Sequence, residues 1–270
     1  MPLIEELILN EYDVALIAPI DDYTELIKRK NIRVLPWMVS RNSINPLKEL
    51  IAVIDLIIIY KRERPSLVHH FTIKACLYGT IAAKIAGVYK VVNAITGLGH
   101  VFLGNKKRNR ILRQILRPIY RAVFMARRGR VVFQNADDQE RLIKLGITDN
   151  SRSRLIRGSG VDINYFCVKN DNAGIYQIPL RILFPSRIIK EKGIEELLQA
   201  CQMLWVQGKK IELFIAGEID DGNRSTLNQS ELEAIKAEHR IHCLGHVQDM
   251  RTQYENSDLV VLPSWREGLS

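Results

Sequence analysis

Short runs of β-branched and apolar residues alternate with longer segments of helical periodicity along almost the whole chain. Residues 182–184 and 259–262 are apolar at every position, which is typical of parallel strands covered on both faces. Because the alternation occurs twice, we expect an α/β protein with two Rossmann-like, doubly wound parallel-sheet domains and a cleft between them. The expected strands lie at 14–19, 33–36, 67–70, 90–94, 131–134, 181–185, 212–216, 241–244 and 259–263, and the expected helices at 45–62, 73–87, 106–128, 136–145, 193–207, 229–239 and 248–256.

The chain of 270 residues divides at a polar segment. Residues 161–179 contain Asn170-Asp171-Asn172 and Gly174, a composition typical of a connector. We therefore expect an N-terminal domain over residues 1–160 and a C-terminal domain over residues 180–270. The chain begins in a helical pattern that leads directly into a strand, and it ends just past a strand. This pattern predicts a fragment truncated at both ends, which lacks its first strand and its last helices.

The charge is distributed unevenly between the two halves. The net charge is +9 for the whole chain, with +13 in residues 1–160 and −4 in residues 161–270. Such asymmetry predicts that the first domain faces an anionic partner, which could be a membrane surface, a nucleic acid or a phosphorylated substrate. Nucleic acid is disfavoured, because aromatic residues make up only 7% and do not interleave with the basic ones.

Cysteine usage and hydropathy predict a cytoplasmic protein. The four cysteines are far apart in the sequence, so neither a disulfide framework nor a cysteine zinc site is expected. The longest apolar run, from Ile51 to Tyr60, is too short to span a bilayer and contains Asp55. The N-terminus is acidic from Glu5 and lacks the basic start of a signal peptide.

Charged residues and glycines follow the expected strands of the second domain, where ligands of open parallel sheets bind. Arg187 and Lys192 flank a loop that closes at Gly193 and the N-terminus of a helix. Two cations and a helix dipole suit a diphosphate, although the loop taken alone also fits a solvated basic surface. The next strand ends carry Gly217, then Gly245-His246-Val247, and then a loop with Glu267. This order suits a nucleotide-sugar site, in which a carboxylate accepts hydrogen bonds from sugar hydroxyls.

Together these motifs resemble the donor half of retaining GT-B glycosyltransferases of family 4. The matching pattern is Ser-Arg-x4-Lys-Gly, Ala-Gly, Leu-Gly-His-Val and Leu-Pro-Ser-x2-Glu-Gly-Leu, between residues 186 and 269. Residues 93–99, 133–135 and 158–162 resemble one bacterial branch of that family. The branch transfers sugars, often N-acetylhexosamines, to undecaprenyl-diphosphate-linked acceptors in glycan assembly. The resemblance covers essentially the whole chain, and the set of motifs is specific although each is weak by itself.

The resemblance implies three catalytic residues. Arg187 and Lys192 would hold the donor diphosphate and stabilise the leaving-group charge. Glu267 would contact the transferred sugar as the first glutamate of a Glu-x7-Glu motif, whose second glutamate would fall beyond Ser270. The other implied donor-binding residues are Gly217, His246, Val247, Gly268 and Leu269, with His246 near the base through its backbone.

The implied acceptor-side residues are His69, Thr96, Gly97 and His100. His69 and its neighbour His70 close a strand and are expected to face the cleft. His69 would contact the acceptor or else have a hydrogen-bonded structural role. Many relatives have a histidine near the donor sugar where this chain has Thr96, and His100 is a candidate to replace it.

The implied reaction retains the anomeric configuration. A nucleoside diphosphate, UDP by family habit, leaves while the acceptor hydroxyl attacks the same face and a phosphate oxygen takes its proton. The sequence contains no Asp-x-Asp motif and no pattern of metal ligands. We therefore expect neither a metal nor a cofactor, the nucleotide sugar being a substrate.

The expected helix 106–128 carries a basic stripe. At about 100° per residue the cations fall within a sector about 80° wide, with apolar residues roughly opposite. Such a helix attracts anionic lipid, so we expect peripheral binding at the inner face of the cytoplasmic membrane; the alternative is a solvated face over an ordinary core stripe. Pro118 should kink the helix or break it in two. The stripe consists of Lys106, Arg110, Arg113, Arg117, Arg121 and Arg128, and the apolar sector of Ile111, Ile115, Ile119, Ala122 and Val123.

Three functions are therefore open. The first is a glycosyltransferase that moves a sugar from a nucleoside-diphosphate sugar to a lipid-linked saccharide acceptor. The second is a UDP-sugar epimerase of the same architecture. The third is a truncated, inactive remnant that still binds a nucleotide sugar. A glutamate eight residues after Glu267 would favour the transferase over the remnant.

Overall fold

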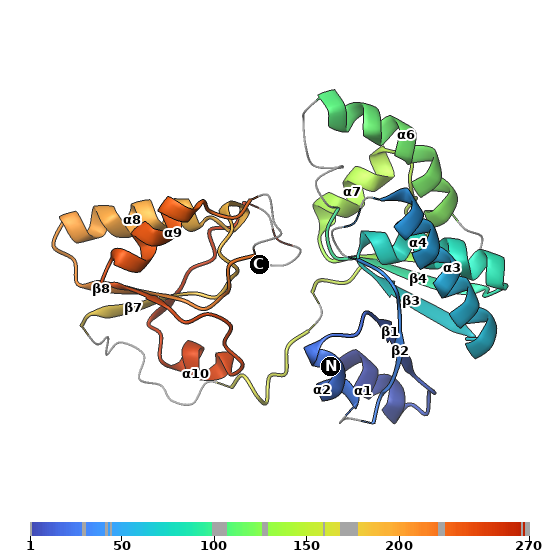
Figure 1. The fold of residues 1–270 in the computed structure, drawn as a ribbon, viewed down its shortest axis with the longest axis horizontal. Coiled ribbons are helices and arrows are strands. Elements are labelled where there is room, and N and C mark those ends of the chain that lie inside the picture. The colour runs from blue at the N-terminus through green and yellow to red at the C-terminus, as the bar shows by residue number, and fades with distance from the viewer. Residues whose placement is uncertain are drawn as a thin grey trace. The chain divides into compact units, whose positions relative to one another are not determined.

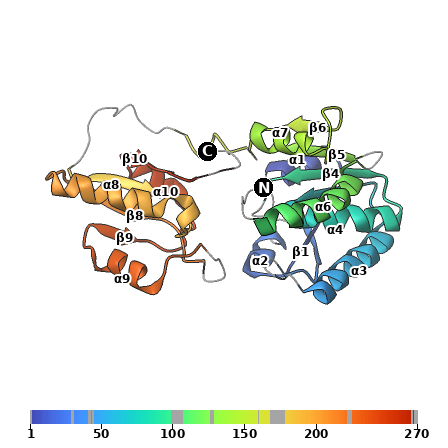
Figure 2. The same ribbon diagram turned by 90° about the horizontal axis from the view of Figure 1, so that it is seen from above.

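The chain forms two compact units, one within residues 1–160 and the other within residues 161–268 (Figures 1 and 2). The computed structural model describes residues 2–28, 31–40, 43, 45–98, 107–125, 129–158, 160–167, 178–220, 225–265 and 267. Within these ranges, every strand pairs only with strands of its own unit, and all pairs are parallel. The chain is thus an α/β protein with two Rossmann-like units rather than one continuous sheet.

The described part of the first unit contains two parallel sheets. In the smaller sheet, β1 (Ala15–Ala18) pairs with β2 (Arg33–Pro36). The larger sheet has the order β3 (Leu67–Phe71), β4 (Lys90–Ile95), β5 (Gly129–Phe133) and β6 (Ser153–Leu155). A helix lies in each connection between these neighbours, so the loops that can carry chemistry gather at the carboxyl ends of the strands.

Six helices are described in the first unit, and their ends follow from local sequence. Asn45 starts the third of them by accepting a hydrogen bond from the Leu47 amide at 3.0 Å, with Pro46 in the first turn. Asn135 starts the last one in the same way, accepting from the Asp138 amide at 2.8 Å. The helices are α1 (Pro2–Leu9), α2 (Asp22–Lys28), α3 (Pro46–Glu63), α4 (Ile73–Ala86), α6 (Lys107–Phe124) and α7 (Ala136–Lys144).

Two clusters of buried side chains stabilise the first unit. One packs α3 and α4 against β2 and β3, and in it the indole of Trp37 donates to the Ala52 carbonyl at 2.9 Å. The other packs α4, α6 and α7 against β4 and β5 around Phe124 and Phe133. Burial of these aromatic rings fixes the sheet that carries the predicted acceptor-side residues.

Among the described residues, the second unit has one four-stranded sheet with helices on both faces. Its order is β10 (Leu259–Val260), β7 (Leu180–Phe184), β8 (Ile211–Ile215) and β9 (Ile241–Cys243). The helices α8 (Ile194–Val206) and α9 (Gln229–Ala237) pack on one face around Phe184 and Leu213. The short helix α10 (Met250–Glu255) lies on the opposite face, where Met250 and Val247 contact Leu183 and its neighbours (Figure 1).

The strand and helix predictions hold for most elements, and the exceptions have physical causes. The strand β6 and the helix α2 in the first unit were not predicted, because both are short and polar. The strand predicted at 259–263 is only two residues long, and Leu259 and Val260 are 53% and 43% exposed. Because consecutive strand residues point to opposite faces, the prediction that this strand is covered on both faces is wrong; within the described residues, β10 pairs with β7 alone.

Helix α6 differs from its prediction in two respects. It runs without interruption from Lys107 to Phe124 through Pro118, so Pro118 does not break it in two, and the alternative, a kink, stays a prediction. Its buried face is formed by Tyr120, Val123 and Phe124, whereas Ile119, predicted on the apolar side, is 43% exposed. The packed face thus lies closer to the arginine stripe than the sequence suggested.

Candidate functional site

The loop after β7, residues 186–193, is held in place by the loop after β8. Ile188 bridges Ile219, and the Ile188 amide donates to the Glu218 carbonyl at 3.0 Å. Ile189 bridges Thr226, and the Lys190 amide donates to the Ser225 carbonyl at 2.8 Å. The backbone that carries Arg187 and Lys192 is therefore fixed by main-chain contacts on both sides of the turn.

Two glycines allow the strand-end loops to approach one another. A β-carbon on Gly217 would lie 2.0 Å from the Ser186 carbonyl oxygen. A β-carbon on Gly193, whose φ is +75°, would lie 2.1 Å from the Pro263 carbonyl oxygen. Any other residue at these positions would push the loops apart. Gly217, which was expected in the donor site, therefore allows the loops after β7 and β8 to pack closely through their backbones.

Arg187 forms an ion pair with Asp220 across these loops. The Nη1 atom of Arg187 donates to Oδ2 of Asp220, and the two side chains are 41% and 24% exposed. Asp220 follows β8 directly after the bridge at Ile219, so the backbone contacts place the carboxylate opposite the guanidinium. Sequence reasoning missed Asp220, although a carboxylate after a strand's carboxyl end was a visible signal.

Lys192 and Glu267, both predicted catalytic residues, contact each other directly. The Lys192 ammonium lies 2.5 Å from Oε1 of Glu267, and the Ser264 hydroxyl donates to the same oxygen at 2.6 Å. Burial of Glu267 opposes ionisation, but the hydrogen bonds from Lys192 and Ser264 and the charges of Lys192 and Arg187 outweigh it and lower the carboxyl pKa. The structure therefore brings the three predicted catalytic residues into one electrostatic group and holds Glu267 ionised near neutral pH.

The loop that carries Glu267 is anchored to the start of α8. The Trp265 amide donates to the Glu191 carbonyl at 3.1 Å, and its indole Nε1 donates to the Glu196 carboxylate at 2.8 Å. These bonds tie the loop after β10 to the loop after β7, so the position of Glu267 depends on the same backbone as that of Lys192. Ser264 belongs to the Leu-Pro-Ser-x2-Glu-Gly-Leu motif but was given no role from the sequence, and Trp265 was not singled out.

The other predicted donor-side residues have different settings. Val247 packs with Met250 on the face of the sheet that α10 covers. His246 follows Gly245, whose φ of +64° gives the turn after β9. Gly268 and Leu269 lie outside the described residues.

In the first unit, His69 and His70 have opposite environments. The Nε2 atom of His70 lies 2.9 Å from the Tyr60 hydroxyl, and its Nδ1 lies 2.8 Å from Oδ1 of Asn93. Burial, partly offset by the Asn93 hydrogen bond, lowers the pKa of His70 to about 4. The prediction that both histidines face a cleft is wrong for His70, because consecutive strand residues point to opposite faces.

His69 stands in a partly buried apolar position. Its ring stacks on Phe71 at 4.3 Å, and burial lowers its pKa. The Nε2 atom of His69 is buried and has no hydrogen-bond partner within the described part of the chain. A hydrogen-bonded structural role for this nitrogen is therefore not observed.

Thr96 and Gly97 follow β4 and are both partly buried. A β-carbon on Gly97 would meet no atom within 4 Å, so the backbone there is open to a close neighbour. His100, the candidate to replace the missing histidine, lies outside the described residues.

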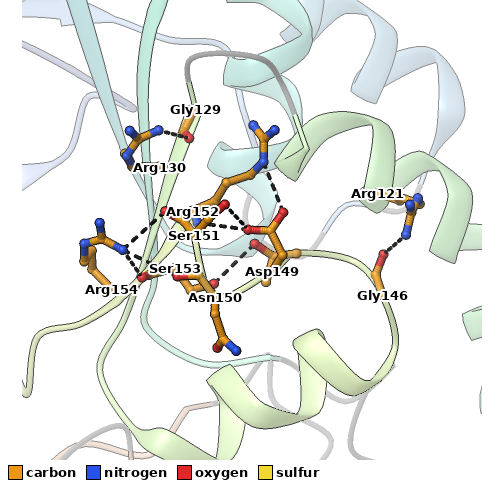
Figure 3. A network of polar contacts seen from close by, with 11 residues as sticks. Arg121, Gly129, Arg130, Gly146, Asp149, Asn150, Ser151, Arg152, Ser153 and Arg154 are labelled. Carbon is orange, nitrogen blue, oxygen red and sulfur yellow. Dashed lines mark hydrogen bonds and ion pairs between the residues drawn. The ribbon is translucent and has the colours of Figure 1, made fainter.

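Only part of the predicted basic stripe can be placed. Lys106 and Arg128 lie outside the described ranges, as do the side chains of Arg110 and Arg113. The guanidinium of Arg121 donates to the Gly146 carbonyl at 2.5 Å, so this cation also stabilises the end of α7 (Figure 3). Arg117 is exposed, and its Nη2 points toward the same glycine.

Other arginines in this region bond mainly to backbone carbonyls. Arg130 donates to the Gly129 carbonyl at 3.2 Å, and Arg154 donates to the Ser153 carbonyl at 2.8 Å (Figure 3). Neither of these two bonds neutralises a charge, whereas Arg152 in the same region forms an ion pair with Asp149 at 3.3 Å.

No helix among the described residues is long and apolar enough to cross a membrane. The same residues contain no group of three histidine, cysteine, aspartate or glutamate side chains able to hold a metal ion. The predicted independence from metal stays a prediction.

Two Rossmann-like units with parallel sheets are the architecture of GT-B glycosyltransferases. Residues 1–135 match the model of the family "Glycosyl transferase 4-like", and residues 169–270 match that of "Glycosyl transferases group 1". The chain belongs to the glycosyl transferase 4-like family, and it is a glycosyltransferase.

Curated relatives extend the comparison. The chain is 24% identical, over 99% of its length and 71% of the relative's, to N,N'-diacetylbacillosaminyl-diphospho-undecaprenol alpha-1,3-N-acetylgalactosaminyltransferase of Campylobacter jejuni. It is also 24% identical, over 98% of its length and 69% of the relative's, to UDP-Gal:alpha-D-GlcNAc-diphosphoundecaprenol alpha-1,3-galactosyltransferase of Escherichia coli. The capsular polysaccharide biosynthesis glycosyltransferase CapM of Staphylococcus aureus is 24% identical over 82% of this chain and 58% of its own length.

Solved structures share the fold. A glycosyltransferase from Rickettsia africae superposes with a TM-score of 0.67 and 18% identity, over 96% of this chain and 67% of that one. Anabaena HepE in complex with UDP-glucose superposes with a TM-score of 0.61 and 17% identity, over 90% of this chain and 64% of that one. The chain thus spans about two thirds of the length of the proteins it resembles.

Proposed function

We propose that this protein transfers a sugar from a nucleoside-diphosphate sugar to a lipid-linked saccharide acceptor, with retention of the anomeric configuration. The observation that carries the proposal is the grouping of Arg187, Lys192 and Glu267 at the carboxyl ends of the second sheet. The names of the Campylobacter and Escherichia relatives, which act on undecaprenol-diphosphate-linked sugars, support the acceptor class and a place in polysaccharide biosynthesis.

In this proposal the second unit, from residue 180 onward, is the donor domain. Arg187 and Lys192 bind the diphosphate, and Gly217 keeps their loop close to the sheet. Glu267 accepts hydrogen bonds from hydroxyls of the transferred sugar, a role that its lowered pKa supports because the carboxylate stays ionised. His246 and Val247, with Gly268 and Leu269, complete the donor-binding set.

The chain's cations supply most of the catalysis that we propose. The bond between the anomeric carbon and the diphosphate breaks, and Arg187 and Lys192 stabilise the negative charge that develops on the leaving group. The acceptor hydroxyl forms the new bond on the same face and gives its proton to a phosphate oxygen of that leaving group. No metal takes part in these steps.

The first unit, residues 1–160, is the proposed acceptor domain. His69, Thr96, Gly97 and His100 are its proposed acceptor-side residues, and the unpartnered Nε2 of His69 supports a polar contact with a ligand. The cations of α6 and of the β5–β6 edge support peripheral binding at the inner, anionic face of the cytoplasmic membrane.

A transfer assay tests the proposal. The protein is incubated with UDP-hexoses or UDP-N-acetylhexosamines and an undecaprenyl-diphosphate-linked monosaccharide, and the lipid product is analysed by mass spectrometry and by NMR of the new anomeric centre. We expect an extended lipid with the donor's anomeric configuration, and loss of product in Arg187→Ala but not in Arg240→Ala, whose ion pair with Glu238 lies elsewhere. Conversion of the free UDP-sugar to its epimer, or donor binding without any turnover, would contradict the proposal.

A further inference from the structure

The ion pair between Arg187 and Asp220 is built into the backbone of the second unit. The bridges Ile188–Ile219 and Ile189–Thr226 hold the two loops on either side of it. The Thr226 hydroxyl also donates to the main-chain carbonyl of Asp220. The carboxylate is therefore preset opposite the guanidinium rather than brought there by a flexible side chain.

A diphosphate that binds Arg187 meets this carboxylate in two ways. Its oxygens compete for the Nη1 donor that Asp220 already occupies. Its negative charge is also repelled by Asp220, because a guanidinium paired with a carboxylate attracts a further anion less than a free guanidinium does.

Lys192 differs from Arg187 in this respect. Its carboxylate partner, Glu267, also accepts a hydrogen bond from Ser264, and in the proposed function it contacts the sugar. Asp220 has no place in the implied catalytic set, and its side chain has Arg187 as the partner that the structure shows.

We propose that Asp220 acts as an internal competitor of the donor diphosphate for Arg187. It weakens the binding of the diphosphate group and favours release of the nucleoside-diphosphate product after transfer. The inference rests on the proposed function, since it assumes that the diphosphate binds at Arg187.

Calorimetric titration with inorganic pyrophosphate tests this role without knowledge of the nucleotide or sugar. We expect Asp220→Asn to lower the dissociation constant of pyrophosphate about three- to tenfold, the range for removal of one partly exposed competing charge. The effect should grow at low ionic strength, where the freed arginine is less screened. Asp220→Ser provides a second variant, and the melting temperatures of both show whether the fold is kept.

Glu238→Gln is the matched control. It removes a carboxylate from an arginine pair in the same unit, where Glu238 accepts from Arg240 at 2.7 Å, and it changes the net charge by the same amount. This variant should bind pyrophosphate like the parent. In an Arg187→Ala background, Asp220→Asn should no longer tighten binding, because the competition has no target.

The outcomes distinguish failure of the Asp220 inference from failure of the proposed function. If the parent binds pyrophosphate through Arg187 but folded Asp220→Asn and Asp220→Ser bind it equally or more weakly, Asp220 is not a competitor and the inference fails alone. If the parent does not bind pyrophosphate, or Arg187→Ala binds it unchanged, the donor site itself is wrong and the proposed function fails with it.

Discussion

Replacing Lys192 by methionine should change both the stability of the second unit and the ionisation of Glu267. The variant keeps the length of the side chain but removes the ammonium that lies 2.5 Å from the Glu267 carboxylate. The side chains are 21% and 23% exposed, so solvent screens the pair only in part. From the range for hydrogen bonds to charged groups, discounted for this exposure, we expect a loss of about 1–2 kcal/mol in the free energy of unfolding at pH 7.

The sign of the pH dependence follows from the lowered pKa of Glu267. In the parent, the folded carboxyl has a pKa below the ordinary value of 4.5, so its contribution to stability is present above that value and is lost as the pH falls through the folded pKa. In Lys192→Met, burial is opposed only by Ser264 and Arg187, so the pKa of Glu267 should rise. The difference in stability between parent and variant should therefore shrink as the pH falls below 4.5.

Urea unfolding between pH 7 and the acid limit of the fold, with carboxyl NMR of Glu267, measures both quantities. Lys236→Met is the control, because Lys236 is exposed on α9 in the same unit and its loss should change stability by less than about 0.5 kcal/mol. The reasoning is refuted if Lys192→Met costs the same free energy at every pH, or if Glu267 titrates with the same midpoint in parent and variant.

Further predictions concern catalysis, packing and the membrane. In the transfer assay, Arg187→Ala and Lys192→Ala should each lose about 2–4 kcal/mol of transition-state stabilisation, and unchanged turnover in both would remove them from the site. Gly217→Ala should destabilise the second unit by more than about 2 kcal/mol in chemical unfolding, because its β-carbon would lie 2.0 Å from a backbone oxygen; a melting temperature equal to the parent's would show that the loops can separate. The protein should sediment with acidic vesicles and be released by salt, and vesicle binding should be abolished by a triple change to glutamate; if that variant binds as tightly as the parent, the helix is only a solvated face. This triple variant carries Arg113→Glu, Arg117→Glu and Arg121→Glu. Because it removes the hydrogen bond from Arg121 to the Gly146 carbonyl, its free energy of unfolding should also fall by up to about 1 kcal/mol.

The sequence predicted the parallel sheets because their strands are continuous apolar runs between helical segments. It did not predict β6, whose three residues Ser153–Leu155 carry little apolar signal. That strand is set by the preceding turn, in which Asp149 accepts from the Arg152 amide at 3.0 Å and from the Ser151 hydroxyl at 2.6 Å. A strand this short, set by a turn that side chains stabilise, has no alternation of apolar and polar residues by which the sequence could predict it.

The sequence predicts which strand ends carry the charged residues of the candidate site, but not how those residues pair. The strand-end positions of Arg187, Lys192 and Glu267 follow from the order of motifs along the chain. Their carboxylate partners depend on which loops meet in space, and the Arg187–Asp220 pair exists because two backbone bridges join the loops after β7 and β8. The different settings of His69 and His70 could have been predicted, since alternation along a strand separates adjacent side chains.

A structure of the protein in complex with UDP tests the central claim most directly. The account predicts diphosphate oxygens within hydrogen-bond distance of Arg187 and Lys192, with Asp220 displaced from the Nη1 of Arg187. A diphosphate bound away from both cations, with both ion pairs of the free protein intact, would contradict it.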